Sequence, residues 1–549
     1  MKNGGQLIVE ALEAQGVTRI FCVPGESYLP VLDALHDSPI STSVCRQEGG
    51  AAMMAEAWGK LAGSPGVCFV TRGPGATNAA AGVHVAAQDS TPMVLFVGQI
   101  DSACRHREAF QEVDYRQFFG DMVKWVAEID SARRVPEMVS MAWHVATAGR
   151  PGPVVLVLPE DTLADQADVA PPALCAPAES HPGPAQIADL QNRLVQAQAP
   201  IIIAGGSRWN EAAVGQLQQF AERWQIPVEC SFRRQALFDH THPCYAGDVG
   251  LGINPDLRAR LDQADLILML GGRLSEIPSQ DYTLLDIPNP RQSLIHVHPG
   301  AEELGKVYQP ALGILSSPTA FMDAIKTLEP PAGLERETAT APETQHQSFL
   351  RWSGIDQAHE QAVMMRGVMN HLREVLPDDA VLTNGAGNYC TWIHRFWHFR
   401  KFGSQVAPTS GSMGYGLPAA IAAKLHAPDK TVVCFAGDGC IQMTGQEFGT
   451  AVQEQANIIV LVLDNSMYGT IRMHQERHFP GRISGTSLSN PDFAMIAKAY
   501  GAHGATVTEV EKFPAAMDAA LAATRSGGTP ALIHVHIDPQ VITPSQVLA

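Results

Sequence analysis

The sequence predicts an α/β protein built on parallel sheets, and three observations indicate this class. Apolar runs that end at glycine turns alternate with amphipathic segments along residues 1–165. Residues 431–465 read as strand, turn, helix and strand, which is a βαβ unit. The chain has 549 residues, which at roughly 150 residues per domain corresponds to three or four domains.

The first block of the chain runs from residue 1 to about residue 165. Residues 6–15 are amphipathic and predict a helix. Buried strands are predicted for four apolar runs, at residues 19–23, 67–71, 94–98 and 153–158. Residues 166–186 are rich in Pro and Ala with few large apolar side chains, so we expect a linker there.

The rest of the chain divides into two further blocks. Strands are predicted at residues 199–204, 266–270 and 293–297 in the middle block, and at 531–537 at the end of the last. The segment 329–346 is rich in Pro, Thr and Glu and predicts a second linker. The expected domains are therefore 1–165, 187–330 and 350–549.

Composition excludes several classes of protein. Hydrophobic residues make up 45% of the chain and charged residues 17%, which argues against disorder. The net charge of −18 and the lack of a long basic run argue against a nucleic-acid partner. No apolar stretch is long enough to span a membrane, and residues 1–20 do not resemble a signal peptide. The ten cysteines are scattered without a Cys-x-x-Cys pair, so we expect free thiols and a cytoplasmic location.

The stretch Gly437-Asp438-Gly439 carries the clearest chemistry. An apolar run at 431–435 precedes it, and Thr-Gly-Gln-Glu at 444–447 reads as a capping box that opens a helix. A second apolar run then ends at Asp464-Asn465. Because parallel neighbours end at one edge of a sheet, Asp438 and Asn465 should meet there. Two oxygen ligands suit Mg²⁺, and glycines let backbone amides approach a diphosphate, so we expect a Mg²⁺–diphosphate site.

This segment resembles the diphosphate motif of thiamine diphosphate (ThDP) enzymes, which runs from Gly-Asp-Gly to an Asn about one βαβ unit later. The resemblance implies that Asp438, Asn465 and the backbone carbonyl of Met467 hold Mg²⁺. It also implies that neighbouring residues of the same two loops contact the cofactor, namely Gly437, Gly439, Cys440, Tyr468 and Gly469.

Residues 46–57, beginning Arg-Gln-Glu-Gly-Gly, resemble the family's segment with the cofactor-activating glutamate, which is Glu48 here. The aminopyrimidine of ThDP must move a proton between its exocyclic nitrogen and the thiazolium C2. A glutamate hydrogen-bonded to the pyrimidine ring nitrogen stabilises the tautomer that acts as the base. Glu56 is the local competitor, and a glutamate on a helix surface is the alternative interpretation.

Three further segments of the first block, at 71–78, 109–114 and 149–154, resemble the acetolactate synthase branch of this family. The glycine-rich turn at 71–78 implies that Thr71, Gly75 and Asn78, together with Gly25, lie near the pyrimidine end of the cofactor. Gln111 would reach the reacting carbonyl. Glu26 lies where related decarboxylases place an active-site polar residue. Ordinary turns and a surface glutamine are the alternative interpretations.

Two segments of the last block continue the resemblance. Residues 384–392 are similar to the Gly-x-Gly segment that contacts the diphosphate, which implies cofactor contacts for Ala386, Gly387, Asn388 and Tyr389. Residues 411–420 are similar to the segment that bends the cofactor. Met413 would be the apolar wedge between its rings, and the carbonyl of Gly411 would accept a hydrogen bond from its amino group. Plain core packing is the alternative for Met413.

The sequence departs from the acetolactate synthases at three places. Their Lys after Leu-Pro is replaced by Glu160, and the Trp that shapes their acceptor pocket aligns with His474. The middle block supplies only Arg273 where two arginines are usual, which makes FAD doubtful. His474 is therefore a candidate for shaping the second step of the reaction, as are Gln111 and Glu26.

The resemblance covers nearly the whole chain and implies three doubly wound parallel-sheet domains: pyrimidine-binding, middle and diphosphate-binding. It implies a ThDP- and Mg²⁺-dependent carboligase, which decarboxylates a 2-oxo acid and transfers the acyl carbanion to a second carbonyl. The alternatives are a simple 2-oxo acid decarboxylase, a 2-hydroxy ketone lyase and a non-catalytic subunit of the same fold. The family's architecture also implies a homodimer or homotetramer with active sites between subunits.

The pentapeptide Leu-Ile-His-Val-His occurs twice, at 294–298 and 532–536. Alternate histidines on a strand share one face and could bind a metal. The preferred interpretation is that each copy ends a strand in similar sheets, because no third ligand is evident in the sequence.

Overall fold

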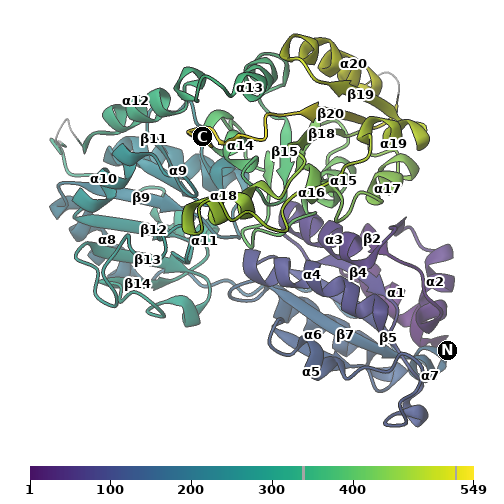
Figure 1. Cartoon of the computed structure of the whole chain (residues 1–549). Coiled ribbons are helices and arrows are strands. Elements are labelled where there is room, and N and C mark those ends of the chain that lie inside the picture. The colour runs from purple at the N-terminus through teal and green to yellow at the C-terminus, as the bar shows by residue number, and fades with distance from the viewer. Residues whose placement is uncertain (335, 337–339, 526–527, 549) are drawn as a thin grey trace.

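Three parallel six-stranded sheets, with helices packed against them, make up the computed structural model of this chain (Figure 1). The structure describes residues 1–334, 336, 340–525 and 528–548. The three sheets lie in three lobes, coloured purple to blue, teal, and green to yellow along the chain. The α/β class and the doubly wound parallel sheets predicted from the sequence are confirmed.

The first and third sheets have the same strand order. Counted along the chain within each sheet, the order is 2-1-3-4-6-5 in both. The first sheet consists of β3 (Ser41–Val44), β2 (Arg19–Cys22), β4 (Gly66–Val70), β5 (Met93–Gln99), β7 (Pro153–Pro159) and β6 (Trp125–Glu128). The third consists of β16 (Gln405–Val406), β15 (Val381–Asn384), β17 (Val432–Gly437), β18 (Ile459–Asp464), β20 (Ala531–His536) and β19 (His503–Val507).

The middle sheet has the order 3-2-1-4-5-6, which is the order of dinucleotide-binding sheets. Its strands are β11 (Tyr245–Val249), β10 (Val228–Ser231), β9 (Pro200–Ala204), β12 (Leu266–Leu270), β13 (Ser293–His298) and β14 (Leu312–Leu315). Each six-stranded sheet therefore has a topological switch point near its middle, between β2 and β4, between β9 and β12, and between β15 and β17. Ligands of open parallel sheets bind at such points, beyond the carboxyl ends of the strands.

Small residues let the first and third sheets' helices pack closely. Helix α3 (Glu48–Ala62) and helix α15 (Gly416–His426) belong to one hydrophobic cluster that spans both parts of the chain. Most of the buried residues of the two helices are alanine or glycine. A Cβ added to Gly82 of α4 (Pro74–Asp89) would lie 2.5 Å from the Cβ of Ala52, so α4 also packs against α3 at short distance.

Most elements predicted from apolar runs are confirmed. The predicted first helix is α1 (Gly4–Ala14), and the predicted strands are β2, β4, β5, β7, β9, β12, β13, β17, β18 and β20. The pair β17–β18 is parallel, as expected for the βαβ unit. The predicted linker at 166–186 contains only the short strand β8 (Gln166–Ala167) before α8 (Pro184–Gln196) begins.

Two predictions about local structure are wrong. The expected second linker at 329–346 overlaps α12 (Pro342–Trp352), whose inner face is buried, while residues 335 and 337–339 lie outside the described residues. The expected capping box is absent. Glu447 should have been the third residue of a helix capped by Thr444, but it is the first residue of α17 (Glu447–Gln453). Thr444 instead donates its hydroxyl to the carbonyl of Gly414, at 2.6 Å.

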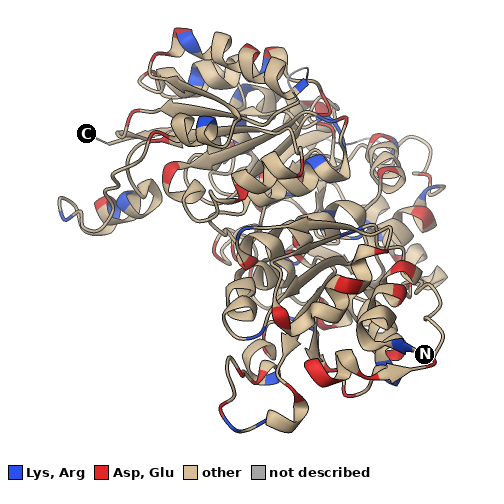
Figure 2. Ribbon diagram, turned by 90° about the vertical axis from the view of Figure 1, so that its right-hand side faces the viewer, with Lys and Arg blue, Asp and Glu red and all other residues tan. Residues whose placement is uncertain are grey.

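Charged residues of both signs are scattered over the ribbon, with Asp and Glu more numerous than Lys and Arg (Figure 2). Among the helices that the structure describes, none has both the length and the apolar character needed to cross a membrane.

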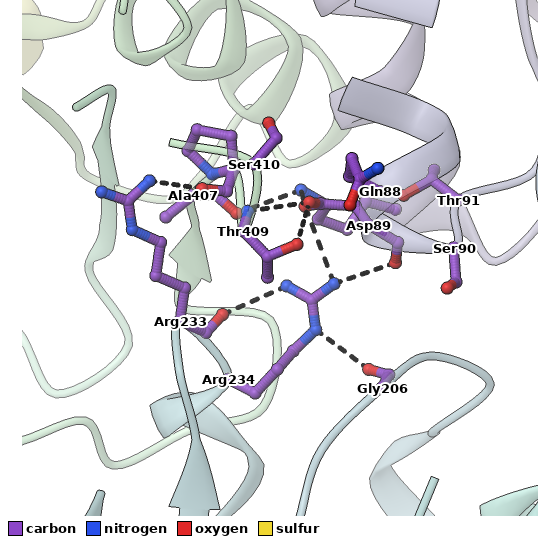
Figure 3. A network of polar contacts seen from close by, with 12 residues as sticks. Gln88, Asp89, Ser90, Thr91, Gly206, Arg233, Arg234, Ala407, Thr409 and Ser410 are labelled. Carbon is purple, nitrogen blue, oxygen red and sulfur yellow. Dashed lines mark hydrogen bonds and ion pairs between the residues drawn. The ribbon is translucent and has the colours of Figure 1, made fainter. Parts of the chain in front are cut away.

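A buried carboxylate joins the three lobes (Figure 3). Asp89, at the end of α4, is 2% exposed and accepts hydrogen bonds from Lys60 Nζ at 2.5 Å and from the backbone of Thr409 at 2.7 Å. The Arg234 guanidinium lies 3.7 Å from the same carboxylate and donates to the Gly206 carbonyl at 2.9 Å. Residues from all three lobes thus meet at the Asp89 carboxylate.

The pKa of Asp89 reflects this environment. Burial alone would raise the pKa, but Lys60 and Arg234 outweigh it and hold the pKa below its ordinary value. The ionised form of Asp89 is therefore the form that stabilises the folded chain.

Replacing Asp89 with Asn should lower the free energy of unfolding by about 3 kcal/mol at neutral pH, because two cations then lose a buried partner. The pKa is lowered on folding, so the stabilisation is present above the ordinary carboxyl pKa of about 4 and is lost as pH falls through the lowered value. Urea denaturation of Asp89→Asn from pH 7 to pH 3 should show the deficit shrinking in acid. The exposed Asp37→Asn serves as the control, and a deficit that grew in acid would contradict the assignment.

Candidate functional site

A cavity of about 250 Å³ lies at the switch point of the third sheet. The loops that follow β15 and β17 form two of its walls, and the segment after β18 forms a third. All the residues predicted from the last block to contact the cofactor line this cavity: Ala386, Gly387, Asn388, Tyr389, Gly411, Met413, Gly437, Asp438, Gly439, Cys440, Asn465, Met467, Tyr468 and Gly469.

The predicted metal ligands lie on the wall of this cavity. Gly437 pairs in register with Leu463, which brings Asp438 and Asn465 to the same edge of the sheet. Asp438 is 2% exposed, and burial raises its pKa to about 6, although a hydrogen bond from Asn490 opposes this shift. The side-chain oxygen of Asn465 accepts from the Met467 amide at 3.3 Å. A carboxylate, an amide oxygen and a backbone segment in one wall fit the oxygen donors that Mg²⁺ takes.

The cavity also fits an anion. Gly469 and Thr470 begin helix α18 (Gly469–His478) and line the cavity, so the positive end of that helix dipole lies there. Gly411 has φ +66° and an added Cβ would meet nothing within 4 Å, so the cavity is open beside it. The Tyr389 hydroxyl is less available to hydrogen-bond a ligand than expected, because it donates to the Cys440 sulfur at 3.2 Å.

Asn490 is a residue of this site that sequence reasoning missed. Its side-chain amide donates to Asp438 Oδ2 at 2.7 Å and to Asp464 Oδ1 at 2.8 Å, so it holds the two carboxylates side by side. The residue lies in a Ser-Asn-Pro stretch that reads as an ordinary turn, and nothing in that stretch marks it.

A second cluster lies at the switch point of the first sheet. Glu48 is the first residue of α3, and its carboxylate accepts from Asn78 Nδ2 at 2.9 Å. A Cβ added to Gly75 would lie 3.4 Å from Glu48 Oε1 and 2.8 Å from the Thr71 methyl. A Cβ added to Gly25 would lie 2.4 Å from the Thr71 Cβ. The predicted pyrimidine-end residues are thus brought together around the Glu48 carboxylate.

Glu56, the local competitor of Glu48, is engaged elsewhere. Its side chain is fully buried, where it accepts from the Thr91 hydroxyl at 2.6 Å and the Tyr415 hydroxyl at 2.5 Å. Lys60 Nζ lies 3.2 Å from the same carboxylate. Glu56 therefore belongs to the network at the junction of the lobes, which leaves Glu48 as the glutamate of the cluster at the first sheet's switch point.

Glu447 is a second residue that sequence reasoning missed, since it was assigned to a capping box. It is fully buried, and its carboxylate accepts from the backbone amides of Arg46 at 3.1 Å and Gln47 at 2.9 Å. Burial raises the pKa of Glu447, and hydrogen bonds from Thr450 and these amides oppose the shift. A residue of the third lobe thereby fixes the turn that leads into Glu48.

The predicted residues Glu26 and Gln111 lie beside an arginine that was not predicted. Arg72 is 7% exposed and forms ion pairs with Glu26, at 2.7 Å, and with Glu160. It also donates to the carbonyl of Phe110 at 3.3 Å. Gln111 has φ +65°, and its Cβ would lie 2.8 Å from a Cβ at Gly73, the residue after Arg72.

His474 lies apart from both clusters. It is exposed on α18, with its ring stacked on that of His478 at a centroid distance of 6.3 Å. The last residue of this helix that lines the cavity is Ile471. Within this single chain, His474 is therefore not part of the cavity.

The two clusters are separate halves within one chain. Among the described residues, those lining the cavity of the third sheet all come from position 386 onward. Glu48, Thr71 and Gly75 are not among them.

Comparison with known protein families identifies the whole arrangement. Residues 2–118 match the N-terminal TPP binding domain of thiamine pyrophosphate enzymes, residues 187–325 their central domain, and residues 385–535 their C-terminal TPP binding domain. The chain belongs to the thiamine diphosphate enzyme family. In this family, the cavity described above corresponds to the C-terminal ThDP-binding domain and the Glu48 cluster to the N-terminal one.

Relatives within the ThDP enzyme family cover nearly the full chain. The acetolactate synthase isozyme 2 large subunit of Escherichia coli is 32% identical, over 98% of this chain and 96% of its own length. The acetolactate synthase large subunit of Corynebacterium glutamicum is 30% identical over 93% and 83%. The mitochondrial catalytic subunit of acetolactate synthase from Saccharomyces cerevisiae is 29% identical over 98% and 81%. The chain is thus a ThDP enzyme related to acetolactate synthase large subunits.

Replacing Glu447 with Ala should slow deuterium exchange at C2 of bound ThDP by up to about 100-fold, because the turn before Glu48 loses its anchor. Glu447→Gln keeps an acceptor for the two amides and should have a smaller effect. Exchange measured by proton NMR, alongside thermal melting, separates displacement of Glu48 from general destabilisation. Unchanged exchange in a folded Glu447→Ala variant would contradict this role.

Proposed function

We propose that this protein is a ThDP- and Mg²⁺-dependent carboligase that decarboxylates a 2-oxo acid and joins the remaining acyl unit to a second carbonyl. The observation that carries the proposal is the pair of clusters at matching switch points of two sheets with the same strand order. One cluster offers metal ligands and an anion-binding helix end. The other offers a carboxylate held for proton transfer.

When bound, ThDP would supply a nucleophilic carbon and an acceptor for the electrons left behind when a 2-oxo acid loses CO₂. Asp438, Asn465 and the Met467 carbonyl would hold Mg²⁺ against the diphosphate. Glu48 would hold a proton at the pyrimidine ring nitrogen, with Asn78 fixing the orientation of its carboxylate. Met413 would separate the two rings of the cofactor.

Proton NMR of the products formed from pyruvate, with ThDP and Mg²⁺ present, tests the proposed reaction. Acetolactate is the expected product of a carboligase that uses pyruvate twice. Acetaldehyde alone would indicate the simple decarboxylase, and consumption of added acetoin would indicate the lyase. Absence of turnover over a panel of 2-oxo acids, with cofactor shown to be bound, would favour the non-catalytic subunit and contradict the proposal.

Replacing Glu48 with Gln should lower C2–H exchange of bound ThDP by at least about 100-fold while largely keeping cofactor affinity, because the amide cannot share a proton with the ring nitrogen. The exposed Glu211→Gln is the matched control. Exchange measured by NMR and affinity measured by calorimetry give separate readouts. Normal exchange in Glu48→Gln would remove Glu48 from the mechanism.

One observation favours a different acceptor in the final step of the reaction. The charge of Arg72 is offset by two carboxylates, Glu26 and Glu160, which leaves this group with a net negative charge. Such a group repels the carboxylate of a second 2-oxo acid. A neutral aldehyde as acceptor, or a proton in the simple decarboxylase, meets no such repulsion.

Replacing Glu160 with Lys should raise kcat/KM for a 2-oxo acid as acceptor by about tenfold, because the charge beside Arg72 changes from net negative to net positive. The same variant should not improve a neutral aldehyde acceptor. Asp168→Lys, with the same change in total charge at an exposed position, is the control. Equal effects of the two variants would show that the charge of the Arg72 group does not select the acceptor.

The remaining parts of the proposal concern organisation. We propose domains at 1–165, 187–330 and 350–549 and a homodimer or homotetramer, in which each active site combines the Glu48 cluster of one subunit with the cavity of another. The separation of the two halves within one chain supports this arrangement.

All ten cysteines are free thiols, which supports a cytoplasmic location. Because the middle domain has only Arg273 of the usual pair, FAD is not part of the proposed reaction.

A further inference from the structure

Two histidines and an aspartate cluster at the carboxyl ends of β18 and β20. Asp464 pairs in register with His536, and His534 precedes His536 by two residues, so all three side chains share one face of the sheet. One ligand atom from each residue lies within 4.8 Å of the others. The sequence alone showed no third residue near the second Leu-Ile-His-Val-His pentapeptide. The neighbouring strand β18 supplies one, Asp464.

His534 has an unsatisfied nitrogen. The residue is 3% exposed, and its Nε2 lies 2.8 Å from Asp464 Oδ2. In the neutral ring, donation from Nε2 to this carboxylate leaves the lone pair on Nδ1. Nδ1 is buried without a hydrogen-bond partner among the described residues, and Asp492 Oδ1 is 4.0 Å away. A buried lone pair beside a second carboxylate favours a bound cation.

The arrangement of Asp464 and His534 is the one that orients metal-binding histidines. Such histidines usually direct one ring nitrogen to a carboxylate and the other to the metal. Asp464 is itself held in place, because Oδ1 accepts from the Ser466 amide at 2.7 Å and from Asn490 at 2.8 Å. His536 is exposed at the strand end, where its ring lies 4.3 Å from that of His534.

The first copy of the pentapeptide provides an internal comparison. On β13, His296 Nε2 lies 2.9 Å from the Gly272 carbonyl, and His298 Nδ1 accepts from the Gly300 amide at 3.0 Å. Backbone groups thus partner one nitrogen of each ring there. In the part of the chain that the structure describes, the β20 copy belongs to a group of three residues with metal-binding atoms, and the β13 copy does not.

We propose that His534 Nδ1, His536 and Asp492 form a second divalent-metal site, distinct from the Mg²⁺ site of the cofactor, in which Asp464 orients the His534 ring. Imidazole donors favour Zn²⁺ and similar transition metals over Mg²⁺. Ligand atoms around one Zn²⁺ are roughly 3.0–3.5 Å apart, and His534 Nδ1 lies 4.0 Å from Asp492 Oδ1, so these two atoms must approach by roughly 0.5–1 Å. His536 is exposed and can turn toward the metal. Asp492 is exposed too, but its Oδ1 accepts from the Met495 amide at 3.1 Å as the N-cap of α19 (Phe493–Ala499), so it would bind through this shared oxygen or through Oδ2.

The two sites share structural partners. Asp464 directly precedes the proposed Mg²⁺ ligand Asn465, and Asn490 donates to both Asp464 and Asp438. A metal at His534 and His536 would therefore be bound next to the loop that carries Asn465.

Binding of Co²⁺, used as a spectroscopic probe, and of Zn²⁺ tests the proposal on the full chain with saturating ThDP and Mg²⁺. We expect one equivalent per chain, with visible Co²⁺ absorption typical of nitrogen ligands. His536→Ala should weaken binding at least about tenfold, and Asp492→Asn should also weaken it. Both residues are at least partly exposed, so folded variants are expected, and the measurement does not depend on enzyme activity.

Two control variants separate this site from other histidines. His181→Ala removes an exposed histidine elsewhere on the chain, and His478→Ala breaks the stacked pair of α18. Neither should change the affinity. Absence of a stoichiometric site, binding unchanged in His536→Ala, or binding lost in His478→Ala would each overturn the proposal.

Discussion

The structure depends on one constraint, which is that a parallel sheet brings its strand ends to a single edge and opens a crevice where its strand order reverses. The first and third sheets satisfy this constraint in the same way, with the same strand order. The loops after β2 and β4 gather Gly25, Thr71 and Gly75 in one sheet. The loops after β15 and β17 gather the cavity residues in the other. Chemistry then follows from which side chains those loops carry.

Buried charge is used in two different ways around these crevices. At the junction of the lobes, Asp89 is surrounded by cations, so its ionised form is favoured and holds three parts of the chain together. In the cavity, no cationic side chain of the described residues pairs with Asp438, and burial raises its pKa. Burying a carboxylate without a cation is costly, and a bound divalent metal offsets that cost. The contrast supports a structural role for Asp89 and a ligand role for Asp438.

Much of this architecture could be predicted because parallel strands buried on both faces appear as continuous apolar runs. The strands at 67–71 and 266–270 are examples, and the glycine turns after them mark the crevices. Asn490 and Glu447 could not be predicted, because each acts on residues distant in the sequence and lies in a stretch that reads as a turn or a helix cap. The same holds for Arg72, whose two carboxylate partners begin two separate short helices, Glu26–Tyr28 and Glu160–Ala164. Long-range polar contacts leave no local pattern.

The central claim is that two half-sites on each chain form complete active sites only between subunits. Mixing separately inactive Glu48→Gln and Asp438→Ala subunits, after dissociation and reassociation, tests it directly. Random pairing makes half of the dimers mixed, and each mixed dimer has one intact site of two, so about a quarter of wild-type activity should return. Activity that stays at the level of the separate variants, with mixed dimers shown to form, would contradict the account.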